Sequence, residues 1–117
     1  MATVLVVDDD PEIVQFVSAA LEDEGFAVTT AIDGHQALEM AAQTPPDLVV
    51  LDMMMPRLDG AGVAAELRRL HGDIPILLMT ADGRAEEKAT RAGEFAHLPK
   101  PFDVNRLLTL VRDRLTP

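Results

Sequence analysis

The 117-residue sequence contains no cysteine and no long apolar run. Without cysteine the chain forms neither disulfides nor a thiolate zinc site, and this absence fits a reducing compartment. No apolar stretch approaches the roughly 20 residues needed to span a bilayer, and the N-terminus lacks the basic region typical of an export signal. We therefore expect a cytoplasmic protein that is not inserted in a membrane.

Basic residues are also scarce, since 10 Lys and Arg stand against 20 Asp and Glu, for a formal net charge of −10. A nucleic-acid binder has to neutralise backbone phosphates, so this charge argues against direct contact with nucleic acid. Hydrophobic residues make up 48% of the chain, enough at this length for one sizeable core. We expect a single domain over residues 1–117.

Short apolar segments rich in β-branched residues alternate with longer segments of helical periodicity. The expected strands are Thr3 to Val7, Phe26 to Ala31, Leu48 to Leu51, Ile74 to Met79 and Phe95 to Leu98. The expected helices run from Asp10-Pro11 to Gly25, Gln36 to Thr44, Gly60 to Leu70, Arg84 to Ala92, and onward from a cap at Asp103. The first helix should bury Ile13, Phe16, Val17, Ala20 and Leu21. Strict alternation with almost continuously apolar strands predicts a three-layer α/β fold with a five-stranded parallel sheet.

Polar residues follow these strands at their carboxyl ends, where open parallel sheets bind ligands. They are Asp8, Asp9 and Asp10 after the first strand, Asp52 after the third, Thr80 after the fourth and Lys100 after the fifth. Clustered carboxylates repel one another unless a cation neutralises them, and oxygen ligands suit Mg²⁺. A carboxylate can attack phosphorus to form an aspartyl phosphate, and an ammonium group can stabilise the developing charge. The pattern predicts a magnesium-dependent phosphoryl-acceptor site.

Taken singly, these residues also have structural interpretations. Asp10 before Pro11 is typical of a helix start, Asp52 is compatible with a turn, and Lys100 with a solvated side chain. All of them would then have to fall at the carboxyl ends of strands by chance. Their joint placement favours a functional site.

Four segments carry a family pattern: VLVVDDD at residues 4–10, LDMMMP at 51–56, LLMTA at 77–81 and LPKPF at 98–102. With these segments the whole chain resembles the receiver domain of two-component response regulators. The resemblance implies a flavodoxin-like, doubly wound sheet with strand order 2-1-3-4-5. It also implies that Asp52 is the phosphorylated aspartate, Thr80 the switch hydroxyl and Lys100 the invariant lysine.

By the same resemblance, Mg²⁺ is coordinated by Asp9, Asp52 and the main-chain carbonyl of Met54, while Asp8 binds mainly through water. A sensor histidine kinase or a histidine phosphotransfer protein is the implied phosphodonor. The chain is then no enzyme with a separate substrate, since its own chemistry is phosphotransfer and autodephosphorylation. The output partner and the oligomeric state, a homodimer included, stay open.

Two features depart from the family pattern. His97 stands three residues before Lys100, where the family usually carries a Tyr or Phe that takes part in the switch. The segment from Thr80 to Gly93 is shorter than the commonest family spacing. We therefore expect an altered switch at His97 and a short or reoriented fourth helix.

Three other functions fit this sequence less well. A haloacid-dehalogenase-like phosphatase needs a second Asp two residues after the nucleophile, where this chain has Met54, which has no proton to donate. A flavodoxin-type cofactor module needs a phosphate-binding loop after the first strand, where three aspartates would repel phosphate. An interaction domain that is never phosphorylated would not need Asp9, Asp52, Thr80 and Lys100 together.

Overall fold

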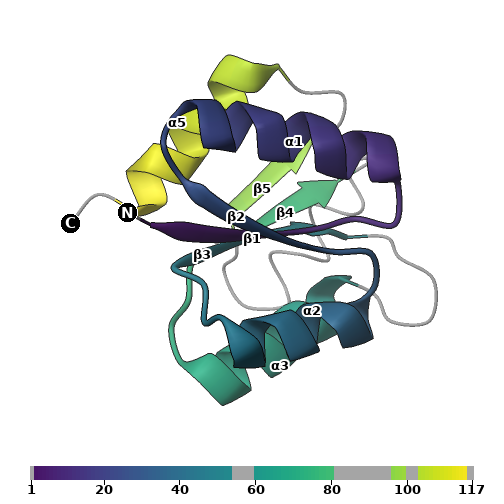
Figure 1. Ribbon diagram of the computed structural model, residues 1–117. Helices are drawn as coiled ribbons and strands as arrows, with labels where there is room; N and C mark the ends of the chain where they lie inside the picture. The colour runs from purple at the N-terminus through teal and green to yellow at the C-terminus, as the bar shows by residue number, and fades with distance from the viewer. Residues whose placement is uncertain (1, 54–59, 81–95, 100–102, 116–117) are drawn as a thin grey trace.

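The computed structural model of the chain describes residues 2–53, 60–80, 96–99 and 103–115 (Figure 1). The strands within them are β1 (Thr3–Val7), β2 (Ala27–Ala31), β3 (Leu48–Asp52), β4 (Ile76–Thr80) and β5 (Ala96–Pro99). The helices are α1 (Pro11–Asp23), α2 (Gly34–Gln43), α3 (Gly60–His71) and α5 (Val104–Leu115). The helix expected over Arg84 to Ala92 lies outside the described residues.

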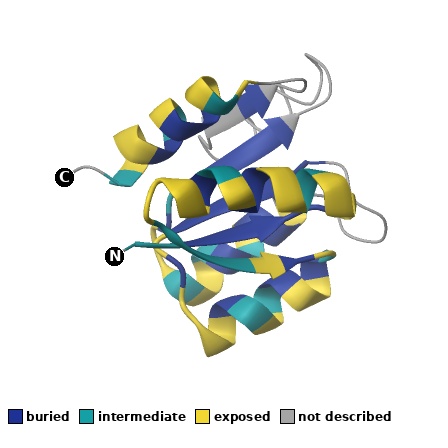
Figure 2. Cartoon of the chain, turned by 45° about the horizontal axis from the view of Figure 1, so that its top comes forward, coloured by how far each residue is buried: buried dark blue, intermediate teal, exposed yellow. Residues whose placement is uncertain are grey.

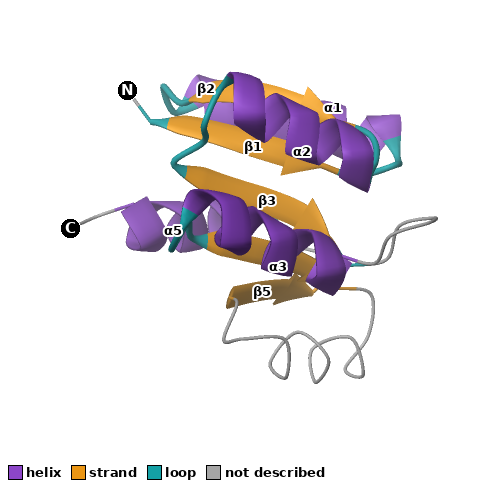
Figure 3. Ribbon diagram, turned by 90° about the horizontal axis from the view of Figure 1, so that it is seen from below, coloured by secondary structure: helices purple, strands orange, loops and turns teal. Residues whose placement is uncertain are grey.

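All five strands form one parallel sheet in the order β2-β1-β3-β4-β5. Helices α1 and α5 cover one face of the sheet, and α2 and α3 cover the other (Figures 1 and 3). The predicted three-layer fold and strand order are therefore confirmed. From β1 the chain moves outward to β2 and then returns to β3 on the other side of β1. The strand order thus reverses between β1 and β3, the position at which doubly wound sheets bind their ligands.

Each face of the sheet is closed by its own apolar cluster. In β1, Leu5 and Val7 belong to the cluster beneath α2 and α3, whereas Val4 and Val6 belong to the cluster beneath α1 and α5. Both side-chain directions of the central strands are therefore buried, as Figure 2 shows by colour. Two covered faces explain why the strand sequences are continuously apolar rather than alternating.

Helix α1 has a well-defined start and stop. Asp10 is its N-cap, and Pro11 occupies the first turn, where a missing N–H costs no helical hydrogen bond. At the other end Gly25 has a φ of 92°, its N–H binds the Glu22 carbonyl, and the Phe26 N–H binds the Leu21 carbonyl. This pair of bonds is the Schellman motif, whose left-handed residue favours glycine.

Some predicted details were wrong. Phe16, expected to be buried, is 47% exposed, because the buried stripe of α1 runs through Val17, Ser18 and Leu21 and Phe16 lies on the side of Val17 away from Ser18. Helix α2 begins at Gly34 rather than Gln36, since Asp33 accepts a hydrogen bond from the Gln36 N–H and caps the helix. Strand β4 begins at Ile76 rather than Ile74, after a turn in which the Ile74 N–H binds the Gly72 carbonyl.

None of the described helices is long and apolar enough to cross a bilayer.

Candidate functional site

The site lies at the carboxyl ends of the two central strands β1 and β3. These strands pair in parallel with Val7 opposite Leu51, so Asp8 and Asp52 are the next residues along each. The backbone there is held on both sides: the Asp8 N–H binds the Ala31 carbonyl at 3.2 Å, and the Met53 N–H binds the Met79 carbonyl at 2.9 Å. The sheet itself therefore brings the two aspartates together.

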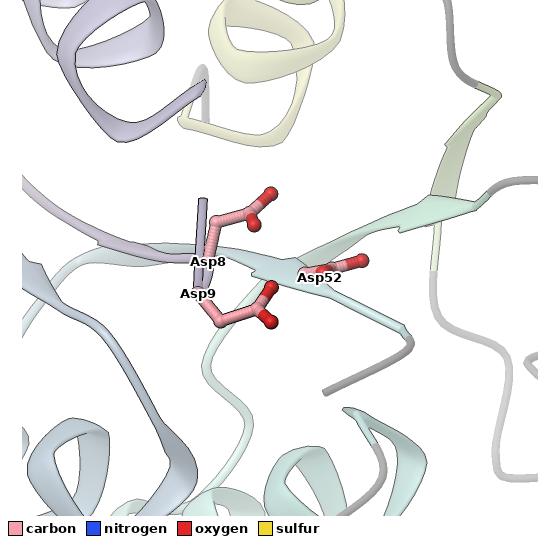
Figure 4. Close-up of side chains that lie close together, drawn as sticks. All are labelled: Asp8, Asp9 and Asp52. Atoms are coloured by element: carbon pink, nitrogen blue, oxygen red, sulfur yellow. The ribbon is translucent and has the colours of Figure 1, made fainter. Parts of the chain in front are cut away.

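Asp8, Asp9 and Asp52 form one acidic group, which we call the acidic triad. One carboxylate oxygen from each residue can be chosen so that all three atoms lie within 4.8 Å of one another. Figure 4 shows the three side chains gathered at the strand ends. Asp8 is fully buried, Asp52 is 6% exposed, and Asp9 is exposed to solvent. The residues predicted to share a site from β1 and β3 are therefore neighbours in space.

Two carboxylates of the acidic triad, Asp8 and Asp52, are unusual for charged groups because they are buried. Moving an ionised carboxylate out of water is costly unless an opposite charge or hydrogen bonds compensate it. The Asp8 Oδ1 accepts a hydrogen bond from the Asp10 N–H at 2.9 Å. A neutral donor of this kind leaves the mutual repulsion among three carboxylates in place, whereas a bound cation removes it. The three carboxylates therefore suit a bound cation.

The spacing of the acidic triad fits a small divalent ion. Oxygen atoms that bind one Mg²⁺ at about 2.1 Å lie at most about 4.2 Å apart. The triad oxygens, within 4.8 Å of one another, need only a slight approach to reach that arrangement. The donor set consists of carboxylates, and one of them opens to solvent, so waters can complete the octahedron that Mg²⁺ prefers. Asp8, Asp9 and Asp52 thus fit the predicted metal.

The remaining predicted residues are placed less completely. Thr80 is the last residue of β4, immediately beyond Met79, which pairs with Asp52, so its backbone lies one strand away from the triad. His97 is in β5, opposite Leu78. The side chains of Thr80 and His97 are not among the described parts, and Met54 and Lys100 lie outside the described residues. Their roles stay predictions.

Sequence reasoning missed one contribution to the site. Asp10 was interpreted only as a helix start, and it is indeed the N-cap of α1. Its backbone N–H, however, also holds the carboxylate of Asp8. The available signal was the spacing of two aspartates at i and i+2 before a proline, since an Asp side chain readily binds the N–H two residues later.

Comparisons with known proteins agree with this geometry. Residues 4–112 match the family described as the response regulator receiver domain. The DNA-binding dual master transcriptional regulator RpaA of Synechocystis is 42% identical over 116 residues, 96% of this chain and 48% of the relative. Response regulator MprA of Mycobacterium leprae is 43% identical over 111 residues, 93% of this chain and 49% of the relative. This chain therefore spans about half the length of these curated relatives.

Solved structures extend the similarity to the whole fold. The chemotaxis protein CheY4 of Vibrio cholerae superposes with a TM-score of 0.91 at 34% identity, covering 98% of this chain and 99% of that one. The receiver domain of NtrX from Brucella abortus gives a TM-score of 0.89 at 33% identity, covering 96% and 97%. With the parallel five-stranded sheet, the acidic triad and the family match taken together, this chain belongs to the response regulator receiver domain family of two-component signalling.

Proposed function

We propose that this chain accepts a phosphoryl group on the Asp52 carboxylate, in a reaction that requires Mg²⁺. The observation that carries the proposal is the position of Asp52. It closes the central strand β3, is 6% exposed, and has an oxygen within 4.8 Å of oxygens of both Asp8 and Asp9. This position puts Asp52 at the carboxyl edge of the sheet, the side from which a phosphodonor would approach.

The phosphodonor is a phosphohistidine of a sensor histidine kinase or of a histidine phosphotransfer protein. An oxygen of Asp52 forms the new O–P bond while the P–N bond of the donor breaks. The electron pair of that bond stays on the imidazole nitrogen, which then takes up a proton. The product is an aspartyl phosphate, a mixed anhydride that water can later hydrolyse.

Asp9, Asp52 and the main-chain carbonyl of Met54 would coordinate the ion, with Asp8 bound through water. The ion would neutralise negative charge on the transferring phosphoryl group. Asp9 and Asp52 have the oxygen spacing and the carboxylate chemistry needed to coordinate Mg²⁺. The assignment of Met54 rests on its place two residues after Asp52 in the family pattern.

Three further residues complete the proposal. The Lys100 ammonium binds a phosphoryl oxygen, and the Thr80 hydroxyl moves toward the phosphoryl group once it is attached. His97 occupies the family's aromatic switch position, so an imidazole follows the movement of Thr80 in this chain. Support comes from the backbone, since β4 lies beside β3 and β5 lies beside β4, and residues 80 and 97 lie in those two strands.

We infer that residues 1–117 form one receiver domain that switches an output surface rather than turning over a separate substrate. Its intrinsic chemistry is limited to phosphotransfer and autodephosphorylation. The absence of direct nucleic-acid contact stays a prediction, because the longer relative RpaA is named a DNA-binding regulator. Any such activity in a longer protein would belong to a partner or an additional domain.

Intact-mass spectrometry tests the proposed function. The wild type incubated with acetyl phosphate and Mg²⁺ should gain one phosphoryl group, while Asp52→Asn gains none because the amide lacks the nucleophilic oxygen. Chelation of divalent ions with EDTA should suppress labelling of the wild type. Equal labelling of wild type and Asp52→Asn would refute the assignment of Asp52, and undiminished labelling in EDTA would refute the role of Mg²⁺.

A further inference from the structure

Asp8 is oriented by a short chain of hydrogen bonds that begins in helix α1. The Asp8 Oδ1 accepts from the Asp10 N–H at 2.9 Å. The Asp10 Oδ1 in turn accepts from the Glu12 N–H, also at 2.9 Å. Two side-chain-to-backbone bonds of the same i to i+2 type therefore follow one another and connect a buried carboxylate of the acidic triad to the first turn of a helix.

Residue 10 is held by more than its side chain. Its carbonyl accepts the N–H of Val14, the first helical bond of α1, and its backbone is extended, with φ −92° and ψ 110°. Pro11 contributes no N–H, so the nearest backbone N–H that follows residue 10 belongs to Glu12. The cap thus sets the orientation of the peptide at residue 10, and with it the direction in which the Asp10 N–H points.

We infer that Asp10 is a positioning residue for the metal site: its side chain, by capping α1, aims its backbone N–H at Asp8 and so holds the Asp8 carboxylate in one orientation within the triad. This inference rests on the proposed function, because it assumes that the triad binds Mg²⁺. Hydrogen-bond partners behind a metal ligand fix the ligand's orientation, and their loss commonly weakens metal binding tenfold or more. Asp10 acts on the ion indirectly, through its bond to Asp8 and through the water by which Asp8 would reach the metal, so a smaller loss is expected.

The competing explanation is charge. Asp10 is exposed and anionic beside the triad, and any neutral substitution would weaken attraction for a cation. Asp10→Asn and Asp10→Ala remove the same charge, but Asn keeps an oxygen that can cap the helix and Ala does not. The difference between these two variants therefore reports the cap, and the difference between wild type and Asp10→Asn reports the charge.

The experiment measures the Mg²⁺ dissociation constant of the full chain by isothermal titration calorimetry, for the wild type, Asp10→Asn and Asp10→Ala. We expect Asp10→Ala to bind roughly fivefold more weakly than Asp10→Asn. The matched control is the cap of α2, where the Asp33 Oδ1 accepts from the Gln36 N–H at 2.8 Å. Asp33→Asn and Asp33→Ala should have equal dissociation constants, because Asp33 caps a different helix from the one whose first turn holds Asp8.

Each outcome decides a different claim. Equal Mg²⁺ affinity of Asp10→Asn and Asp10→Ala would overturn the inference and leave the proposed function intact. A similar gap between the two Asp33 variants would also overturn it, since a general loss of helix stability would then explain the effect. If the wild type binds no Mg²⁺, the proposed metal site fails, and the positioning role fails with it.

A second measurement covers the case in which Asp10→Ala does not fold. Hydrogen exchange of the residue-10 amide is followed by NMR in the wild type, with and without Mg²⁺ at ten times its dissociation constant. The positioning role requires that the bond to Asp8 opens before this amide exchanges, and that Mg²⁺ leaves when the bond opens. Exchange in the Mg²⁺-bound protein should then be about tenfold slower than in the metal-free protein. Unchanged exchange at residue 10 in the Mg²⁺-bound protein would contradict the positioning role.

Discussion

Asp8 and Asp9 are adjacent in the chain but occupy opposite environments. Asp8 is fully buried and accepts the Asp10 N–H, whereas Asp9 is exposed to solvent. The chain bends at Asp9, so both neighbouring carboxylates reach the same site while only that of Asp9 stays open to solvent. Asp9 can be changed without removing a hydrogen bond on which the fold depends, which makes it suitable for testing electrostatic repulsion.

Asp9→Ala should be more stable than the wild type in EDTA, by about 1 kcal/mol or less, because it removes repulsion across a partly solvated gap. At tenfold the dissociation constant, Mg²⁺ should raise the free energy of unfolding of the wild type by about 1.4 kcal/mol. The variant should gain much less, since a ligand is lost. Urea denaturation with EDTA or Mg²⁺ measures both effects, and a destabilised metal-free Asp9→Ala would indicate a structural role for this residue.

At the scale of single residues, the sequence predicted that the aspartates at the ends of β1 and β3 lie together, because strands determine their position. Asp8 and Asp52 directly continue two neighbouring strands, so parallel pairing brings them together without further information. The role of the Asp10 N–H was missed, because backbone hydrogen bonds depend on local dihedral angles that residue types do not specify. Phe16 was misjudged, since the buried stripe of α1 includes the polar Ser18, which an apolar pattern does not assign to the core, and is turned away from Phe16.

Helix α1 connects the site to the opposite end of the molecule. It begins at the Asp10 cap and ends in the Schellman motif at Gly25, whose φ of 92° lies in the left-handed region. A Cβ built on Gly25 meets nothing within 4 Å. Glycine is therefore favoured at this position by the backbone conformation and not by a lack of space for a side chain.

Gly25→Ala should lower the free energy of unfolding by about 1–2 kcal/mol, the cost of a left-handed conformation for a residue with a Cβ. Gly25→Asn should cost less, because Asn tolerates this conformation better than Ala. Both variants should keep the Mg²⁺ affinity of the wild type, because the change lies at the end of α1 away from the triad. Thermal denaturation measures the stability of both variants, and calorimetry measures their Mg²⁺ affinity. If Gly25→Asn destabilises the protein as much as Gly25→Ala or more, the backbone explanation is wrong.

At the scale of elements, the existence and order of the helices and strands were more predictable than their boundaries. The alternation of apolar segments gave all five strands and their parallel arrangement, because only helices on both faces can cover such strands. The start of α2 was placed two residues late, since Asp33-Gly34 has the composition of a turn and only the bond from the Gln36 N–H identifies Asp33 as a cap. The region predicted as the fourth helix lies outside the described residues and stays a prediction.

Charge is distributed very unevenly over the whole molecule. Residues 1–56 contain 11 of the 20 acidic residues and none of the 10 Lys and Arg, which all follow in residues 57–117. The first half comprises β1, α1, β2, α2 and β3, so it forms the β2 side of the sheet, while β4, β5 and α5 form the other side. The site at the ends of β1 and β3 therefore opens on the border of a strongly negative half.

An anionic phosphodonor should be repelled by the electric field of the acidic half of the molecule. At saturating Mg²⁺, labelling by acetyl phosphate should accelerate by roughly twofold to fivefold when the salt concentration rises from about 0.02 M to about 0.2 M, because salt screens the repulsion. Phosphoramidate, which carries less net negative charge, is the control and should respond less. A labelling rate that falls with salt would mean that the bound ion and Lys100, rather than the acidic half, dominate the field at the site.

The identity of the phosphorylated residue is tested most directly by locating the modification in the chain. Protein labelled with acetyl phosphate and Mg²⁺ is treated with borohydride, which reduces an aspartyl phosphate to homoserine, and is then digested and sequenced by mass spectrometry. Our account predicts conversion at Asp52, with Asp8 and Asp9 unchanged. Homoserine at Asp8 or Asp9, or label retained on a histidine while Asp52 stays intact, would contradict it.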